Sequence, residues 1–169
     1  MTLAARRPGA ALAWALALAL LAGCASPGGA PLGAPRQGVV ASLGAPALSV
    51  PLPDGGERLL YTTQPSGFQV FHLDFDAAGR LVRREQVLTQ ARLAAIPAGQ
   101  WTVADVQRTW GPPMRVERVA RFDGDIWTYR FLGDFQERRQ GHVHIDRAGV
   151  VRKVVFTDEP LPGEDRPFF

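Results

Sequence analysis

Residues 107–113 read Gln-Arg-Thr-Trp-Gly-Pro-Pro, and residues 40–46, Val-Ala-Ser-Leu-Gly-Ala-Pro, show the same pattern 67 positions earlier (107 minus 40). Glycine ends a helix well because it tolerates a positive φ, and proline cannot continue a helix. Two copies of one helix-ending signal predict two small units that are built alike.

Three later matches extend this repeat, and their spacing drifts to 70 positions (146 minus 76), as a few inserted loop residues would make it. We therefore predict a degenerate first repeat over residues 37–93 and a second repeat over residues 97–158. The matched segments are Asp54-Gly55 with Asp123-Gly124, Leu60-Tyr61-Thr62 with Thr128-Tyr129-Arg130, and residues 71–79 with residues 141–149.

Each repeat begins with a short predicted helix. In the second repeat it runs from Thr102 to Trp110, where Thr102 and Asp105 are spaced almost as in a capping box. Gly111 then ends it. In the first repeat the helix covers Gly38 to Leu43 and ends at Gly44.

Alternating strands are expected to follow each helix. Trp127, Tyr129 and Phe131 share one face of a strand, while Val143 and Ile145 lie opposite the neighbouring histidines of another. We therefore expect an α+β fold, with one or two short helices packed on a three- or four-stranded antiparallel meander in each repeat. Residues 86–95, between the repeats, could be a short helix or the end of a strand.

The N-terminus carries the pattern of a secretory signal. Arg6 and Arg7 precede an uncharged apolar run of 13 residues from Ala10 to Ala22. A helix that spans a bilayer needs roughly 20 apolar residues, so this run is too short to be a membrane span. We expect residues 1–23 to be a signal peptide.

Leu21-Ala22-Gly23-Cys24 resembles the lipobox that the lipoprotein signal peptidase recognises. This resemblance implies cleavage before Cys24, a diacylglyceryl thioether on its sulfur and a further acyl chain, such as palmitate, on its amine. Two or three acyl chains anchor a protein durably, whereas one anchors it only marginally. The alternative is an ordinary signal cut just after the cysteine, which would release a soluble protein.

Composition limits the chemistry that the mature chain can perform. Cys24 is the only cysteine, so an internal disulfide and thiolate catalysis are excluded. After residues 1–23 are removed, 17 basic residues (19 minus Arg6 and Arg7) face 16 acidic ones. This balance argues against a nucleic-acid partner. Residues 24–36 and 159–169 are rich in breakers, which predicts a flexible tether and a Pro-rich tail that ends in Phe168-Phe169.

The strongest candidate for a metal site is His142-x-His144-x-Asp146, whose side chains share one strand face. A solvated sheet face explains the same pattern, and in the first repeat Asp74 replaces His144. Asp123 and Asp125 could serve as acid and base, but they fit a hairpin turn better. We therefore expect no metal, no cofactor, no small-molecule substrate and no catalysis.

Aromatic residues are numerous for so small a chain. Trp127 and Tyr129 alternate strictly, which favours a place in the core, whereas Trp101 could lie in the core or on a binding surface. Trp110 stands directly before the helix-ending glycine.

A lipobox followed by a helix that ends in Gly-x-Pro and by a sheet with a Trp-x-Tyr strand resembles the SmpA/OmlA type of small outer-membrane lipoprotein. One member of that family is an accessory subunit of the β-barrel assembly machinery, and it usually has a single copy of the unit. A tandem pair is also similar to the β-lactamase-inhibitor-protein fold, in which two copies form one sheet with a concave binding face. Trp110-Gly111-Pro112-Pro113, Trp127-Thr128-Tyr129 and residues 146–151 carry the resemblance, and Leu43-Gly44-Ala45-Pro46, Tyr61 and residues 76–81 carry a weaker one.

The resemblance implies a noncatalytic, lipid-anchored protein that binds other envelope or outer-membrane proteins. Because Ala25 and Ser26 follow Cys24, it also implies the periplasmic face of the outer membrane, since aspartate there retains such proteins at the inner membrane. Two alternatives remain open from the sequence. One is an inhibitor or regulator of a periplasmic enzyme that binds through a concave tandem sheet, and the other is a metal-dependent hydrolase built on His142 and His144.

Overall fold

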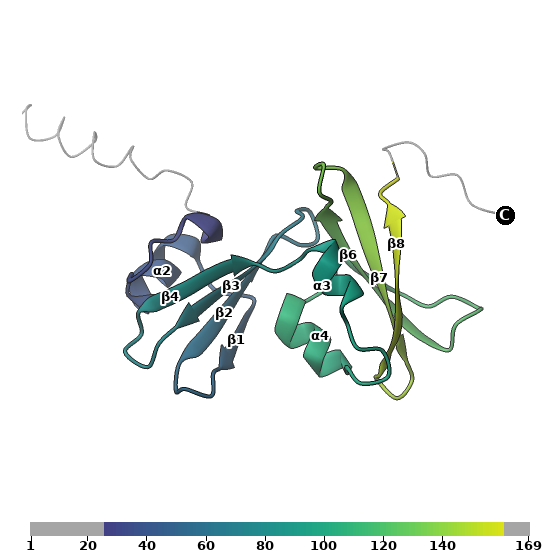
Figure 1. Cartoon of the computed structure of the whole chain (residues 1–169), viewed down its shortest axis with the longest axis horizontal. Helices are drawn as coiled ribbons and strands as arrows, with labels where there is room; N and C mark the ends of the chain where they lie inside the picture. The colour runs from purple at the N-terminus through teal and green to yellow at the C-terminus, as the bar shows by residue number, and fades with distance from the viewer. Residues whose placement is uncertain (1–25, 161–169) are drawn as a thin grey trace, which may run out of the picture.

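The computed structural model describes residues 26–160 and shows two antiparallel sheets with short helices, which confirms the α+β class (Figure 1). The signal peptide, Cys24 and Phe168-Phe169 lie outside these residues. Among residues 26–160, no helix is long and apolar enough to cross a membrane. The helices are η1 (Pro27–Gly29, a 3₁₀ turn), α2 (Arg36–Leu43), α3 (Gln90–Ala94) and α4 (Val103–Trp110).

Both sheets are four-stranded meanders whose strands follow chain order. In the first sheet this order is β1-β2-β3-β4, and in the second it is β5-β6-β7-β8. The strands of the first sheet are β1 (Leu48–Pro51), β2 (Glu57–Thr62), β3 (Val70–Phe75) and β4 (Leu81–Gln86). Those of the second are β5 (Arg115–Glu117), β6 (Gly124–Leu132), β7 (Arg138–Asp146) and β8 (Val151–Asp158).

Both predicted helix ends are present. Gly44 ends α2 with φ 81° and Gly111 ends α4 with φ 69°, values that a side chain disfavours. Thr102 and Asp105 form the expected capping box at the start of α4. Helix α2 begins at Arg36, two residues before the sequence prediction, because the Arg36 N–H donates to Gly79 O at 2.9 Å.

Residues 26–88 form the first unit, whose own core lies between α2 and one face of the first sheet. Val39 of α2 belongs to the same buried cluster as Leu59 and Tyr61 of β2. Alternation along β3 sends every second side chain into this core. The buried members are Ala30, Val39, Leu59, Tyr61, Phe71, Leu73, Phe75 and Leu81.

The second core is shared between the two units. Residues 89–160 form the second unit, yet Leu60 and Val70 of the first sheet belong to the same buried cluster as Val106 and Trp110 of α4. Trp110 Nε1 donates to Val87 O at 3.1 Å, which links the two units further. Helix α4 therefore packs between the two sheets, and every residue of β3 is buried.

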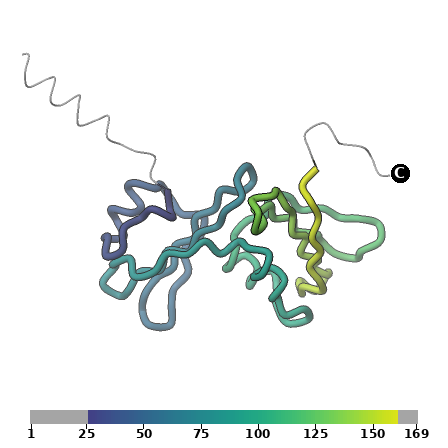
Figure 2. Tube along the Cα trace, turned by 45° about the horizontal axis from the view of Figure 1, so that its top comes forward, coloured from purple at the N-terminus to yellow at the C-terminus, as the bar shows by residue number. Residues whose placement is uncertain are grey.

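The result is a stack of four layers, in the order α2, first sheet, α3 with α4, and second sheet (Figures 1 and 2). The inhibitor-type resemblance implies one continuous sheet. In residues 26–160 the two sheets instead hydrogen-bond only within themselves, because α4 separates them.

The N-terminal segment of the described chain differs from the predicted tether. Ala30 is buried, Gly33 N–H donates to Leu81 O at 2.7 Å, and Leu81 N–H donates to Ala34 O at 3.0 Å. Residues 26–35 therefore run along β4 as part of the first unit, because backbone pairing and Ala30 hold them there.

The boundary between the units also differs from the prediction. The sequence predicts a first repeat that reaches residue 93, but Leu93 of α3 lies in the shared core against the second sheet. A Cβ on Gly141 would lie 2.8 Å from Leu93 Cδ1, so glycine at this position of β7 lets α3 approach. Between residues 86 and 95 the chain contains both a strand end and a short helix, since β4 ends at Gln86 and α3 follows.

Candidate protein-binding surface

The second sheet has one face that no helix covers among residues 26–160 (Figure 1). We call it the outward face. Helix α4 covers the opposite face, and α2 and α4 cover the two faces of the first sheet. The side chains of the outward face, from the register of β5 to β8, are Arg115, Glu117, Ile126, Thr128, Arg130, Gln140, His142, His144, Lys153, Val155 and Thr157.

The middle of this face is well packed although no helix covers it. Thr128, Gln140 and Ile126 are each less than one-tenth exposed, whereas Val155 on the edge strand β8 is 39% exposed. Such a surface is already ordered and carries an apolar side chain beside hydrogen-bonding groups. Preorganised surfaces of this kind lose little conformational entropy when they bind.

His142 is held at the centre of the outward face by two hydroxyls. Its Nδ1 lies 2.9 Å from Thr128 Oγ1 and its Nε2 lies 2.9 Å from Thr157 Oγ1. Burial lowers the pKa of His142, and Arg115 lowers it further, while Glu117 raises it by less. Both ring nitrogens are thereby engaged within the sheet.

His144 lies beside His142 on the same face, as the strand period predicts. Its ring meets the ring of Phe122 edge to face, with centroids 4.9 Å apart. Burial also lowers its pKa, as do Lys153 and His142. Its buried Nδ1 has no hydrogen-bond partner between Ser26 and Pro160.

Asp146, the third member of the predicted metal cluster, stabilises the turn after β7 through hydrogen bonds. Its carboxylate accepts the N–H groups of Ala148 and Val150 and the Nε–H of Arg152. The Val150 hydrogen bond is the largest effect that lowers the pKa of Asp146. In the described part of the chain no group of three His, Cys, Asp or Glu side chains is arranged to hold a metal ion.

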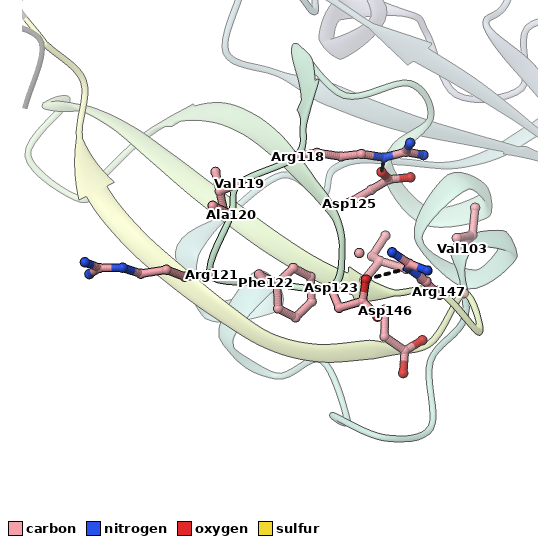
Figure 3. Close-up of a pocket in the computed structure, with 13 residues that line it drawn as sticks. Val103, Arg118, Val119, Ala120, Arg121, Phe122, Asp123, Asp125, Asp146 and Arg147 are labelled. Carbon is pink, nitrogen blue, oxygen red and sulfur yellow. Dashed lines mark hydrogen bonds and ion pairs between the residues drawn. The ribbon is translucent and has the colours of Figure 1, made fainter.

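A pocket of about 1200 Å³ opens at one end of the second sheet, between the loop 118–123, the turn after β7 and the start of α4 (Figure 3). Phe122 lies beneath the arch of this loop and Val103 lies on the opposite side. Val119 adds a third apolar side chain, and it is 45% exposed.

Most of the charged groups of the pocket are paired, and Arg121 is the exception among the described residues. Arg118 Nε lies 2.6 Å from Asp125 Oδ1, and Arg147 Nε lies 2.5 Å from Asp123 Oδ1. Asp123 ends the hairpin loop and Asp125 already belongs to β6, so the two acids flank a strand start rather than face a common reactant. The pocket thus offers apolar walls within a rim of balanced charge.

A loop of the first unit forms another border of the outward face. Gln64 Nε2 donates to Arg130 O at 2.8 Å, on the part of β6 that β5 is too short to pair. The Arg130 guanidinium lies 4.4 Å from the centroid of the Phe68 ring and forms an ion pair with Glu159. The sequence offered no signal for this contact, because it joins residues 66 positions apart.

The aromatic residues named from the sequence lie mostly in the core. Tyr129 is fully buried and Trp127 is 9% exposed, which confirms the prediction for both. Trp101, which the sequence left open, is partly buried and packs on Trp110 with ring centroids 5.6 Å apart. These aromatic side chains therefore stabilise the fold, and they contribute little to the exposed surface.

Comparison with known proteins gives little help with function. No protein-family model matches the chain, and no curated protein matches it. Among solved structures, a DUF4309 family protein (YjgB) from Bacillus subtilis is similar at 19% identity, over 75% of this chain and 79% of that one, with a TM-score of 0.31.

Proposed function

We propose that this chain is a noncatalytic envelope lipoprotein that binds another protein through the outward face of its second sheet. The uncovered face carries this proposal. Within residues 26–160 every other sheet face has a helix packed on it, and this one carries instead an exposed Val155 and a preorganised histidine and ends beside a pocket.

The hydrogen bonding of the face supports binding over catalysis. A general acid or base must reach its substrate with a free proton or lone pair. His142 already bonds two hydroxyls, Asp146 bonds its own turn, and Asp125 forms an ion pair with Arg118. These groups order the surface.

Membrane anchoring is the second part of the proposal, and it rests on the lipobox at Cys24. Acylation there would hold the protein on the periplasmic face of the outer membrane, where partners in outer-membrane protein assembly or envelope integrity are found. This role agrees with the resemblance to the SmpA/OmlA type.

Recurring contacts support an origin of the two units by duplication. Tyr61 Oη donates to Gly44 O at 3.0 Å, and Tyr129 Oη donates to Gly111 O at 2.8 Å. Both sheets also change register after an equivalent residue of their third strand, at Asp74 and at His144. We propose that the second unit kept the open face for binding while the first acquired a cover on both sides.

Photocrosslinking from inside the envelope tests the proposal. A crosslinking amino acid at position 155 should form an adduct with a partner protein, and the same group at Phe135, which is 93% exposed on the β6–β7 hairpin, should not. The Cys24→Ala variant should lose the adduct, because the lipid brings the partners together.

Other outcomes separate the alternatives. Adducts to one soluble periplasmic enzyme, with and without Cys24, would favour an inhibitor or regulator. Failure to form any adduct from position 155, with the protein folded and acylated, would remove the outward face as the binding surface.

A further inference from the structure

The described part of the chain begins very close to the proposed anchor. Only Ala25 separates Cys24 from Ser26, the first described residue. Two residues span at most about 7 Å, so the acylated cysteine cannot lie farther than this from the position of Ser26. A lipid on Cys24 would therefore place the surface around residues 26–35 next to the membrane.

Residues 26–35 are held firmly on the first unit. Arg84 donates to Ala30 O, and residues 33 and 34 pair with Leu81 of β4. Ala30 is only 6% exposed. The first sheet thus fixes the place at which the described chain begins.

Two large apolar side chains are exposed beside this segment. Leu32 is 61% exposed and Val82 is 55% exposed. They flank the hydrogen bond from Gly33 N–H to Leu81 O, so they lie on neighbouring stretches of chain. Exposed aliphatic side chains next to a lipid anchor are suited to the bilayer interface.

Two arginines of the same stretch of chain, Arg80 and Arg84, bond residues 26–35. Arg80 and Arg84 are exposed, and both donate to backbone carbonyls, Gly33 O and Ala30 O. Neither forms an ion pair with a carboxylate in the described residues. Arg83 pairs with Glu85, and the nearby Asp76 accepts the Arg80 backbone N–H at 2.8 Å. We call Leu32, Arg80, Val82 and Arg84 the N-terminal patch; Arg83 lies on the opposite face of β4, across from Asp74.

We infer that the N-terminal patch rests on an anionic phospholipid surface, with guanidinium groups on the phosphates and Leu32 and Val82 in the interface. This inference deepens the proposed function, because it depends on acylation of Cys24. Guanidinium pairs well with phosphate, and an attached lipid raises the effective concentration of the surface. The patch lies on the first unit, so the outward face at the other end of the stack is left free for a partner (Figure 1).

Hydroxyl-radical footprinting of the acylated chain tests this contact. The protein is placed in vesicles of phosphatidylethanolamine with phosphatidylglycerol, in vesicles of phosphatidylcholine, and in detergent. Oxidation of Leu32 and Val82 should be slowest in the phosphatidylglycerol vesicles. Phe135, which is 93% exposed on the second unit, should react equally in all three.

A double substitution, R80Q with R84Q, makes the test specific. Each arginine near an anionic surface is worth about a fivefold change in the docking equilibrium, so the loss of both should shift this equilibrium about 25-fold toward the undocked state. Leu32 should then react as it does in detergent. The matched variant R80K with R84K keeps both positive charges while it changes the same two bonds to Gly33 O and Ala30 O, and it should leave the protection of Leu32 unchanged.

The outcomes also separate this inference from the proposed function. Equal oxidation of Leu32 in all three environments, in a protein whose mass shows acylation, would overturn the patch and leave the anchor. Protection that persists in R80Q with R84Q would overturn the role of the arginines. An unmodified Cys24 in protein isolated from the envelope would instead contradict the anchor on which both proposals rest.

Discussion

The first and second units share their local chemistry but differ in what covers them. Each has a helix that ends at a glycine, a tyrosine bonded to that glycine and a four-stranded meander. The first sheet lies between α2 and α4, whereas the second has α4 on only one side. The comparison teaches that similar units can expose different surfaces, because stacking covers both faces of one sheet and leaves one face of the other uncovered.

The largest expected effect comes from Trp110→Ala in the shared core. Trp110 is 1% exposed and bonds Val87 O, so the change should cost about 3–5 kcal/mol of unfolding free energy. Leu43 ends α2 as Trp110 ends α4 but is only partly buried, so Leu43→Ala should cost about 1 kcal/mol. Urea unfolding followed by circular dichroism measures both.

The same experiment shows whether the units unfold together. Because α4 packs on both sheets, Trp110→Ala should leave a single transition at lower urea. Two separate transitions, with the first unit unaffected by the substitution, would contradict the shared core.

The next largest effect should come from alanine at the two helix-ending glycines, and the loss of stability should differ between the two units. Both residues combine a positive φ with an extended ψ, so Gly44→Ala should cost about 1–3 kcal/mol from backbone strain. Gly111→Ala should cost more, because its Cβ would lie 2.9 Å from Leu60 Cδ2 while nothing lies within 4 Å at Gly44. Thermal unfolding of the two variants should rank them in this order, and equal losses would argue against the close packing at Gly111.

Removing the tyrosine hydroxyl that recurs in both units, at Tyr61 and Tyr129, should give a smaller difference in unfolding free energy. Tyr129→Phe leaves the buried Gly111 O without its donor and should cost about 1–2 kcal/mol. Tyr61→Phe should cost about 0.5 kcal/mol, because Gly44 is exposed and water can replace the hydroxyl. Urea midpoints of both variants test this, and a larger loss at Tyr61 would contradict it.

The smallest expected effect is on pH dependence. Burial lowers the pKa of His72 and of His142, so the unfolded chain binds protons more readily and stability falls as the pH drops below about 6.5. His72 is 6% exposed and bonded to Thr109 O at 2.7 Å. His72→Gln should therefore flatten the fall between pH 7 and 5 more than His142→Gln does, as urea midpoints at several pH values would show.

Much of the local structure could be predicted from the sequence because it depends on neighbouring residues. The capping box at Thr102, the stops at Gly44 and Gly111 and the alternation at Trp127 and Tyr129 follow from short-range rules. The position of α4 between the sheets could not be predicted in this way. One signal was available, since Leu59-Leu60-Tyr61 is apolar on both faces of its strand and a strand covered on both sides needs such a run.

The predicted site residues show the same division. His142 and His144 do lie on one face, as the strand period requires, but their partners Thr128, Thr157 and Phe122 come from other elements. The tether was predicted from local composition alone. The structure instead pairs residues 33 and 34 with Leu81, on a strand about 48 positions away (81 minus 33). Long-range pairings of this kind leave no mark in local sequence.

Helix α4 also makes the first sheet depend on a later part of the chain. Val106 and Trp110 share a buried cluster with Leu60 and Val70, so one face of the first sheet stays apolar and uncovered until α4 packs on it. We expect the first sheet to become fully ordered only after α4 has docked, and to be prone to aggregation before then. For the same reason residues 26–88 produced alone should aggregate, even though all four of their strands are present.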